Sequence, residues 1–262
     1  MPYSNDQWEY FKNWQNFSKE KDLEYSLQQF NFVLDRLKHS NPFSIIRFGE
    51  GESRIVISEQ NLNRKELSYN PSIESDSIYR KELLDSAKVD LPNYFIGIQS
   101  YTYKPGEKDR PFNEFTEQRR KIYELGKFSY EKYTCSRIFC NFPEKCVTEL
   151  LPEMNKHECY FVGNKSANTK IFNLKNKWSI SPKDAWKHDR NLYTQLEEEV
   201  KNINNSVFII TGGFFANILI SKLAKVNNNN YYINVGSVFD PLLYGSFTRG
   251  YQKNCTMYGK WK

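Results

Sequence analysis

The chain has 262 residues, of which 39% are hydrophobic and 26% are charged, a composition typical of a globular protein with a substantial core. This composition excludes an intrinsically disordered chain, and no apolar run approaches the ~20 residues that a membrane-spanning helix needs. The formal charge of +6 is spread along the chain without a basic block, so it suits an anionic small ligand at least as well as a nucleic acid.

Two helices are predicted within residues 1–40, as an N-terminal extension packed on the rest of the chain. The first begins at Ser4 or Asn5 and carries large apolar side chains at Trp8, Phe11, Trp14 and Phe17. The second has apolar residues spaced alternately by four and three, at Leu23, Leu27, Phe30, Leu34 and Leu37. This spacing gives one apolar stripe, which we interpret as a packing face.

Short apolar runs alternate with helical patterns over the rest of the chain. Strands are predicted at 43–48, 94–99, 136–140, 159–162, 207–211 and 231–235. Helices are predicted at 76–90, 111–127, 144–155, 181–203 and 215–226, with Ser181 as the cap of the fourth. This alternation predicts an α/β fold in which helices flank a Rossmann-like, mostly parallel sheet, and residues 1–262 form a single domain.

The N-terminus and the cysteines favour a cytoplasmic protein. Residues 1–10 carry acidic side chains and no apolar stretch, so no secretory signal is predicted. The cysteines are odd in number and form no C-x-x-C pair: Cys135, Cys140, Cys146, Cys159 and Cys255. We expect reduced, mostly buried thiols, although a metal site that combines the first three with His157 or Cys159 is an alternative.

The first candidate site is the segment Arg47-Phe48-Gly49-Glu50-Gly51-Glu52, which follows the strand predicted at 43–48 as a tight turn. Ligands of open parallel sheets bind beyond the carboxyl ends of the strands, and Gly49 and Gly51 would let the backbone approach a ligand closely. Glu50 and Glu52 could share a divalent cation, Mn²⁺ or Mg²⁺, that bridges a diphosphate. Arg47 would add a guanidinium to the same phosphates. The alternative is a solvated acidic turn in which Arg47 pairs with a neighbouring acid.

The second candidate is the glycine pair at Gly212 and Gly213, between a predicted strand and a predicted helix. Such a turn can point free N–H groups at an anion. The segment lacks both G-x-G-x-x-G and the GK[ST] of a P-loop, so ordinary turn chemistry explains the pair equally well.

The third candidate follows the last predicted strand. Asp240 could act as a general base or a metal ligand, with Ser237 beside it, while Arg249 and Tyr251 could hold a phosphate and stack on a base. The alternative is that Asp240 caps a turn and that Arg249 and Tyr251 only close the end of the sheet. There is no G-x-S-x-G, H-E-x-x-H or plausible Cys–His pairing, so the catalytic motifs that a hydrolase or a zinc enzyme would need are missing.

Three of these segments resemble GT-D-type glycosyltransferases. Residues 44–52 resemble the S-x-x-R-F-G-D-G-E segment of that family, residues 207–223 its late strand, glycine turn and helix, and residues 232–237 its closing I-D-I-G strand. The matching pieces run from about residue 43 to 251. The resemblance implies a Rossmann-like parallel sheet, a nucleotide-sugar donor and a divalent metal at a D-x-E motif.

The chain departs from the family pattern at two positions. Glu50 is one methylene longer than the first acid of D-x-E, so either the metal geometry is altered or only Glu52 counts. Asn234 stands where I-D-I-G has its aspartate, so it is not an acid catalyst, and Asp240 is the remaining acid on that edge.

From this resemblance we expect a cytoplasmic, metal-assisted glycosyltransferase that moves a sugar from a nucleotide-diphosphate donor to a glycan hydroxyl. Arg47 and the metal would neutralise the leaving diphosphate, and Asp240 or Glu52 would deprotonate the acceptor if the reaction inverts. The composition resembles that of an AT-rich genome, which would suit a bacterial surface-glycan enzyme or one from a large virus.

Two other classes of function are alternatives. A nonenzymatic basic nucleic-acid-binding module would need a clustered Lys and Arg face, which the sequence does not show. A nucleotide-dependent methyltransferase would need a glycine-rich first loop, which is missing.

Overall fold

The computed structural model describes residues 19–57, 62–63, 68–98, 121–126 and 128–261. Its main feature is a seven-stranded, all-parallel sheet in the order β5-β4-β1-β9-β8-β6-β7. The strands are β1 (Ser44–Arg47), β4 (Tyr94–Ile98), β5 (Tyr133–Cys135), β6 (Cys159–Asn164), β7 (Leu174–Ile180), β8 (Val207–Ile210) and β9 (Tyr231–Asn234). A separate antiparallel pair joins β2 (Leu62–Asn63) to β3 (Ser68–Tyr69). The predicted α/β fold with a Rossmann-like parallel sheet is confirmed.

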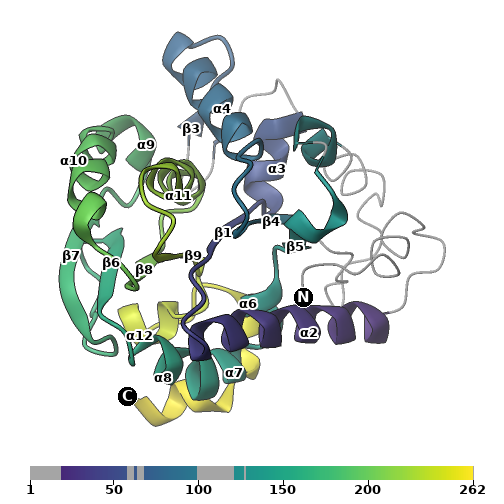
Figure 1. The fold of residues 1–262 in the computed structure, drawn as a ribbon, viewed down its shortest axis with the longest axis vertical. Helices are drawn as coiled ribbons and strands as arrows, with labels where there is room; N and C mark the ends of the chain where they lie inside the picture. Colours follow the sequence, from purple (N-terminus) through teal and green to yellow (C-terminus); the bar gives the residue numbers. More distant parts are fainter. Residues whose placement is uncertain (1–18, 58–61, 64–67, 99–120, 127, 262) are drawn as a thin grey trace.

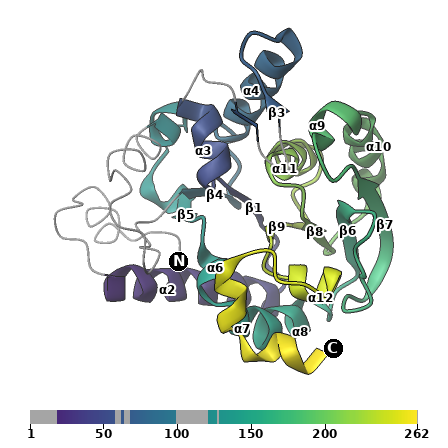
Figure 2. The same ribbon diagram turned by 180° about the vertical axis from the view of Figure 1, so that it is seen from behind.

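Helices cover both faces of the sheet (Figures 1 and 2). One face carries α3 (Glu50–Ile57), α4 (Glu74–Ser86), α9 (Ala185–His188), α10 (Asn191–Glu199) and α11 (Phe214–Val226). The opposite face carries α2 (Lys19–Lys38), α6 (Ile138–Asn141), α7 (Pro143–Lys145), α8 (Leu151–Met154) and α12 (Asp240–Tyr244). A π-helical turn, Cys146–Leu150, joins α7 to α8, and 3₁₀ segments lie at Tyr130–Lys132, Val200–Asn202, Gly250–Asn254 and Thr256–Trp261. No helix in the described part of the chain is both long and apolar enough to span a membrane.

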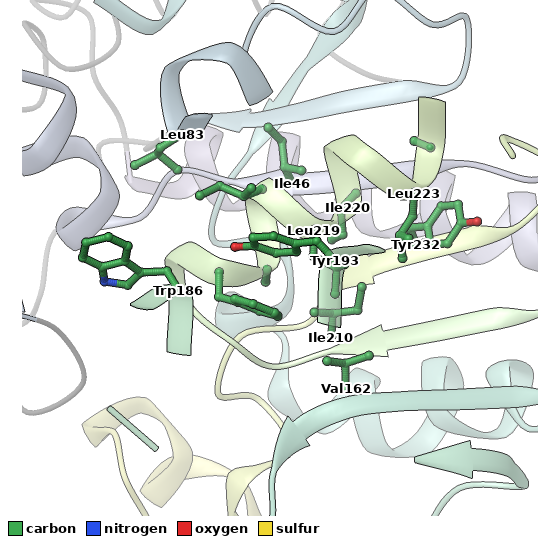
Figure 3. Close-up of a cluster of buried hydrophobic side chains, with 14 of the residues drawn as sticks. Ile46, Leu83, Val162, Trp186, Tyr193, Ile210, Leu219, Ile220, Leu223 and Tyr232 are labelled. Atoms are coloured by element: carbon green, nitrogen blue, oxygen red, sulfur yellow. The ribbon is translucent and has the colours of Figure 1, made fainter. Parts of the chain in front are cut away.

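Apart from the edge strand β7, the sheet is buried on both faces, so its strands are almost continuously apolar. Successive side chains of a strand point to opposite faces. Ile46 and Tyr232 therefore belong to the cluster under α11, while Ile45 and Ile233 belong to the cluster against α2. Figure 3 shows strand residues of the first cluster next to α11, namely Ile46, Val162, Ile210 and Tyr232 with Leu219, Ile220 and Leu223. Continuous apolar runs of this kind are what a doubly covered parallel sheet requires.

The acidic segment after β1 is a helix, so the predicted tight turn is wrong. Glu50 begins α3, and the N–H of Ser53 donates to the carbonyl of Gly49 at 3.0 Å. Two acidic residues in the first helical turn suit the positive end of the helix dipole. Their carboxylates thereby belong to a regular element rather than to a loop.

Two further elements differ from the prediction. Residues 136–140 are not a strand, because β5 ends at Cys135 and α6 buries Ile138 and Phe139. A short apolar run has no periodicity that separates a strand from a buried helical turn. Ser181 caps no helix: its N–H donates to the carboxylate of Asp189 at 2.8 Å, and helical structure starts only after Asp184.

The strand β7 was not predicted. Its exposed side chains are mostly polar, and only Trp178 and Ile180 are buried. It lies at the edge of the sheet, where one neighbour is missing and polar residues are tolerated.

The helix predicted to cover 76–90 is found as α4, and the second N-terminal helix is found as α2. The first N-terminal helix lies outside the described residues. Of the helix predicted at 111–127, residues 121–126 are helical and the others lie outside the described residues.

Candidate functional site

The three candidate segments lie at one edge of the sheet. Arg47 ends β1, Gly212 follows β8, and Ser237 follows β9. These strands are parallel and adjacent in the order β1-β9-β8, so their carboxyl ends point the same way. The tertiary structure thus brings together segments that are up to 190 residues apart in the sequence.

The adjacent strands β1 and β9 continue, beyond their carboxyl ends, into helices on opposite faces of the sheet. β1 leads into α3, on the face of α11, whereas β9 leads into α12, on the face of α2 (Figures 1 and 2). In open α/β sheets, ligands bind outside the carboxyl ends of strands where connections diverge in this way. The candidate site is therefore centred on the ends of β1 and β9.

Arg47 brings a positive charge to the end of β1. Its guanidinium lies over the ring of Phe139, 5.6 Å from the centroid, with Nη1 4.0 Å from Sγ of Cys140. It also lies against Gly236, whose Cβ, if present, would be 2.4 Å from Nη2. Within the described part of the chain, Arg47 forms no ion pair with a carboxylate, and its buried Nε has no hydrogen-bond partner. Among the described residues, Arg47 therefore does not pair with a neighbouring acid, contrary to the alternative interpretation of this segment.

Cys140 and Tyr251 form a polar contact beside Arg47. Burial raises the pKa of the Cys140 thiol, but the charges of Arg47 and Arg137 and a hydrogen bond from Tyr251 outweigh it, so the pKa lies below its usual value. Burial, together with the neighbouring thiol, raises the pKa of Tyr251, whose hydroxyl lies 2.9 Å from Oγ of Ser237. The Tyr251 hydroxyl therefore joins Cys140 of α6 to Ser237, which follows β9.

Glu52 is half-buried in the first turn of α3, and its side chain folds back toward the end of β1. Its Oε2 lies 3.0 Å from the point where a Cβ on Gly49 would stand. Glu50 begins the same turn, but its side chain lies outside the described part of the structure.

No group of three His, Cys, Asp or Glu side chains gathers to hold a metal among the described residues. The alternative of a cysteine metal site is accordingly not found there, and the five cysteines are free, four of them buried, as expected. A cation that accompanies a diphosphate needs only one or two protein carboxylates, since phosphate oxygens and water complete its shell. Glu52 fits that smaller requirement.

The glycines of the first two segments serve different purposes. A Cβ on Gly51 would stand 2.9 Å from Cζ of Phe214, and one on Gly212 would stand 3.0 Å from Cδ1 of Ile180. These glycines allow protein elements to approach each other. Gly213 instead has a positive φ of 53° with nothing within 4 Å of its Cβ position, so the backbone conformation requires it and the space beside it is open.

Asp240 begins α12 and accepts a hydrogen bond from the hydroxyl of Thr248. The chain after α12 is tied back by the buried Gln252, which accepts from the N–H groups of Thr248 and Arg249 at 2.7 and 2.9 Å. Its Nε2 donates to the carbonyl of Ser237 at 2.5 Å. This segment therefore fixes the orientation of the Asp240 carboxylate, and the Arg249 side chain lies exposed at its surface, with Nη1 donating to the carbonyl of Thr248.

Asn217 of α11 was missed by the sequence prediction. It is fully buried, and its side-chain amide bonds both the N–H and the carbonyl of Arg47, at 3.0 and 2.9 Å. The signal was present, because a lone asparagine interrupts the apolar start of the helix Phe214–Val226. Arg137 and Cys140 were also missed as parts of the site, since 136–140 was predicted to be a strand.

No protein-family model and no curated protein matches the sequence. Two solved structures match over 86% of this chain and 85% of theirs. One is described by the words "the highly conserved domain of unknown function 1792 has a distinct glycosyltransferase fold", with 14% identity and a TM-score of 0.57. The other is a selenomethionine-substituted structure of domain of unknown function 1792, with 13% identity and a TM-score of 0.56.

This chain has that glycosyltransferase fold. At this level of identity the likeness concerns the fold, and it confirms the resemblance to GT-D-type proteins at that level. The function depends on the residues of the site, which one fold can vary widely.

Proposed function

We propose that the protein is a cytoplasmic, metal-assisted glycosyltransferase that moves a sugar from a nucleotide-diphosphate donor to a glycan hydroxyl. One observation carries the proposal. Arg47, without a carboxylate partner among the described residues, lies where β1 and β9 diverge, and Glu52 lies in the helical turn that follows it. A fixed guanidinium and a carboxylate at the carboxyl end of the same strand suit a diphosphate with its cation, and the shared glycosyltransferase fold supports this proposal.

In the proposed reaction Arg47 stabilises the negative charge that develops on the leaving diphosphate. The guanidinium is held in place before the donor binds, so little reorganisation is needed in the transition state. The open backbone at Gly213, where α11 begins, leaves room for phosphate oxygens near the positive end of that helix. When bound, a divalent cation at Glu52 would offset further phosphate charge.

Asp240 is the proposed base for the acceptor hydroxyl if the reaction inverts. Its carboxylate follows β9 on the same edge as Arg47, and the Thr248 hydroxyl fixes one of its oxygens. A base must be held within hydrogen-bond reach of the proton that it removes, which this arrangement favours.

The experiment is a thermal-shift and calorimetric screen of nucleoside diphosphates and nucleotide sugars, with and without Mn²⁺, on the wild type and Arg47→Gln. We expect one nucleotide to stabilise the wild type in a metal-dependent manner and to bind Arg47→Gln more weakly. Absence of binding by every nucleotide, together with polynucleotide binding whose salt slope approaches about −0.9 per phosphate contact, would instead indicate a nucleic-acid-binding module.

A further inference from the structure

The side-chain amide of Asn217 binds Arg47 as a neighbouring strand would. The N–H of Arg47 donates to Oδ1 at 3.0 Å, and Nδ2 donates to the Arg47 carbonyl at 2.9 Å. The β1–β9 ladder pairs only Ser44 and Ile45 of β1, so it does not extend to Arg47. An amide side chain offers the same donor and acceptor as a peptide group, and it therefore completes the end of β1.

Asn234 extends this hydrogen-bond network from Asn217 to Gly236. Its Nδ2 donates to Oδ1 of Asn217 at 2.8 Å, and its Oδ1 accepts from the N–H of Gly236 at 3.1 Å. Gly236 has a positive φ of 60° and lies directly against the Arg47 guanidinium. A continuous series of contacts thus runs from the Arg47 backbone through Asn217, Asn234 and Gly236 to the Arg47 guanidinium.

We propose that Asn217 is a positioning residue which, through Asn234 and Gly236, holds the Arg47 guanidinium in place for the donor diphosphate. The role toward the diphosphate rests on the proposed function. The arrangement also explains why an asparagine occupies position 234. A carboxylate there has no proton to donate to Oδ1 of Asn217, and its charge would compete with the phosphates for Arg47.

A second buried asparagine provides the matched control. Asn230 is also fully buried, and its side chain makes three hydrogen bonds, to Ser206, Ile203 and Tyr232. It lies just before β9, at the opposite edge of the sheet from Arg47. Loss of either amide leaves buried polar groups unsatisfied, but only Asn217 leads to the site.

The Cys140 thiol reports the position of Arg47 without any nucleotide. The groups that act on this thiol are Arg47 from β1, Arg137 just before the helix of Cys140, Tyr251 and Tyr258 from the C-terminal segments, and Cys146. Arg47 lies at 4.0 Å and favours the thiolate. Displacement of the guanidinium should therefore raise the pH midpoint for alkylation of Cys140, which peptide mass spectrometry can follow separately from the other cysteines.

The experiment compares Asn217→Ala, Asn234→Ala, Asn230→Ala, Arg47→Gln and the wild type. We expect the first two variants to raise the alkylation midpoint toward that of Arg47→Gln, with Asn230→Ala unchanged. Asn234→Ala keeps both bonds from Asn217 to the Arg47 backbone, so it remains informative if Asn217→Ala does not fold. By calorimetry, both should weaken nucleoside diphosphate binding by about tenfold or more, since small displacements of a binding group carry costs of this order.

Each part of the proposal can fail by itself. If Arg47→Gln raises the midpoint and neither asparagine variant does, Asn217 does not hold Arg47 and the inference is overturned. An Arg47→Gln variant with the wild-type midpoint would overturn it too, because the guanidinium would then not lie beside Cys140. A wild-type protein that binds no nucleoside diphosphate would overturn the proposed function, while the thiol midpoints still decide whether Asn217 positions Arg47.

Discussion

Gly51 in the first turn of α3 lies against the ring of Phe214 at the first residue of α11, so that a Cβ on Gly51 would stand 2.9 Å from Cζ. The two helices follow β1 and β8, which flank β9. This contact therefore brings the positive ends of both helices together above the end of β9. The second glycine of the R-F-G-E-G-E segment permits this approach of the helices.

Gly51→Ala should destabilise the protein by about 1 kcal/mol. Overpacking against Phe214 costs about 1–3 kcal/mol, and the better helix propensity of alanine returns up to about 1 kcal/mol. Urea unfolding measures the effect. In a double-mutant cycle, Phe214→Leu should relieve most of the cost, whereas Gly250→Ala, with nothing within 4 Å of its Cβ position, should change stability by less than about 0.5 kcal/mol. An additive Gly51–Phe214 cycle would contradict the steric explanation.

Glu52→Gln should lower sugar transfer by on the order of a hundredfold, because the variant keeps the shape of the side chain and removes its charge from the proposed donor site. The free energy of unfolding should fall by no more than about 1 kcal/mol, the usual value of an acid in a first helical turn. Glu74→Gln in the first turn of α4 is the control for the helix effect and should leave transfer intact. Full transfer by Glu52→Gln with an unchanged metal requirement would rule out the assigned role.

Asp240→Asn should lower the rate of transfer by about a hundredfold or more while donor affinity stays the same, since in its proposed role as general base Asp240 acts only on the acceptor. The amide can still accept from Thr248, so the loop should keep its structure. Single-turnover transfer and nucleotide calorimetry separate the two effects. A matching loss of donor affinity would instead place Asp240 at the donor.

Arg47→Lys should weaken nucleoside diphosphate binding by about tenfold, because an ammonium keeps the charge and loses the planar fork of donors. Arg36→Lys is the matched control. Like Arg47, Arg36 lies over aromatic rings, but it is at the amino-terminal edge of the sheet. Its guanidinium donates to the carbonyl of Pro42. Calorimetry should find wild-type affinity in Arg36→Lys. Equal losses in both variants would point to a general structural effect.

Stability should fall steeply above pH 10, because burial raises the pKa of several tyrosines: Tyr79, Tyr94, Tyr133, Tyr193 and Tyr232. The folded state keeps these protons where the unfolded state has lost them. Each group then removes up to about 1.4 kcal/mol of stability per pH unit above its unfolded pKa.

Two tyrosine variants test this dependence through urea unfolding between pH 7 and 11. Tyr193→Phe should be nearly neutral at pH 7, since its buried hydroxyl has no hydrogen-bond partner among the described residues, and should flatten the alkaline slope. Tyr94→Phe should flatten the slope equally but cost about 1 kcal/mol at pH 7, because it loses the bond to the Ser86 carbonyl. A slope unaffected by either substitution would contradict the assignment.

The sequence by itself determined the α/β class and the edge of the sheet at which the candidate segments lie. Strands buried on both faces must be almost continuously apolar, as at Ile45 and Ile46, and such runs can be read without any tertiary information. Because Arg47, Gly212 and Ser237 each follow such a run, their common edge follows from parallel pairing.

Only the tertiary structure decided what surrounds Arg47. Asn217 is 170 residues away from Arg47 in the sequence, and its role depends on a contact that no local pattern encodes. The same holds for β7, whose polar side chains are tolerated only because it is an edge strand, and for Gly51, whose function depends on a ring from another helix. Local propensity and periodicity describe which face of an element is buried, whereas the identity of the residue on the other side of a contact is settled only when the elements pack.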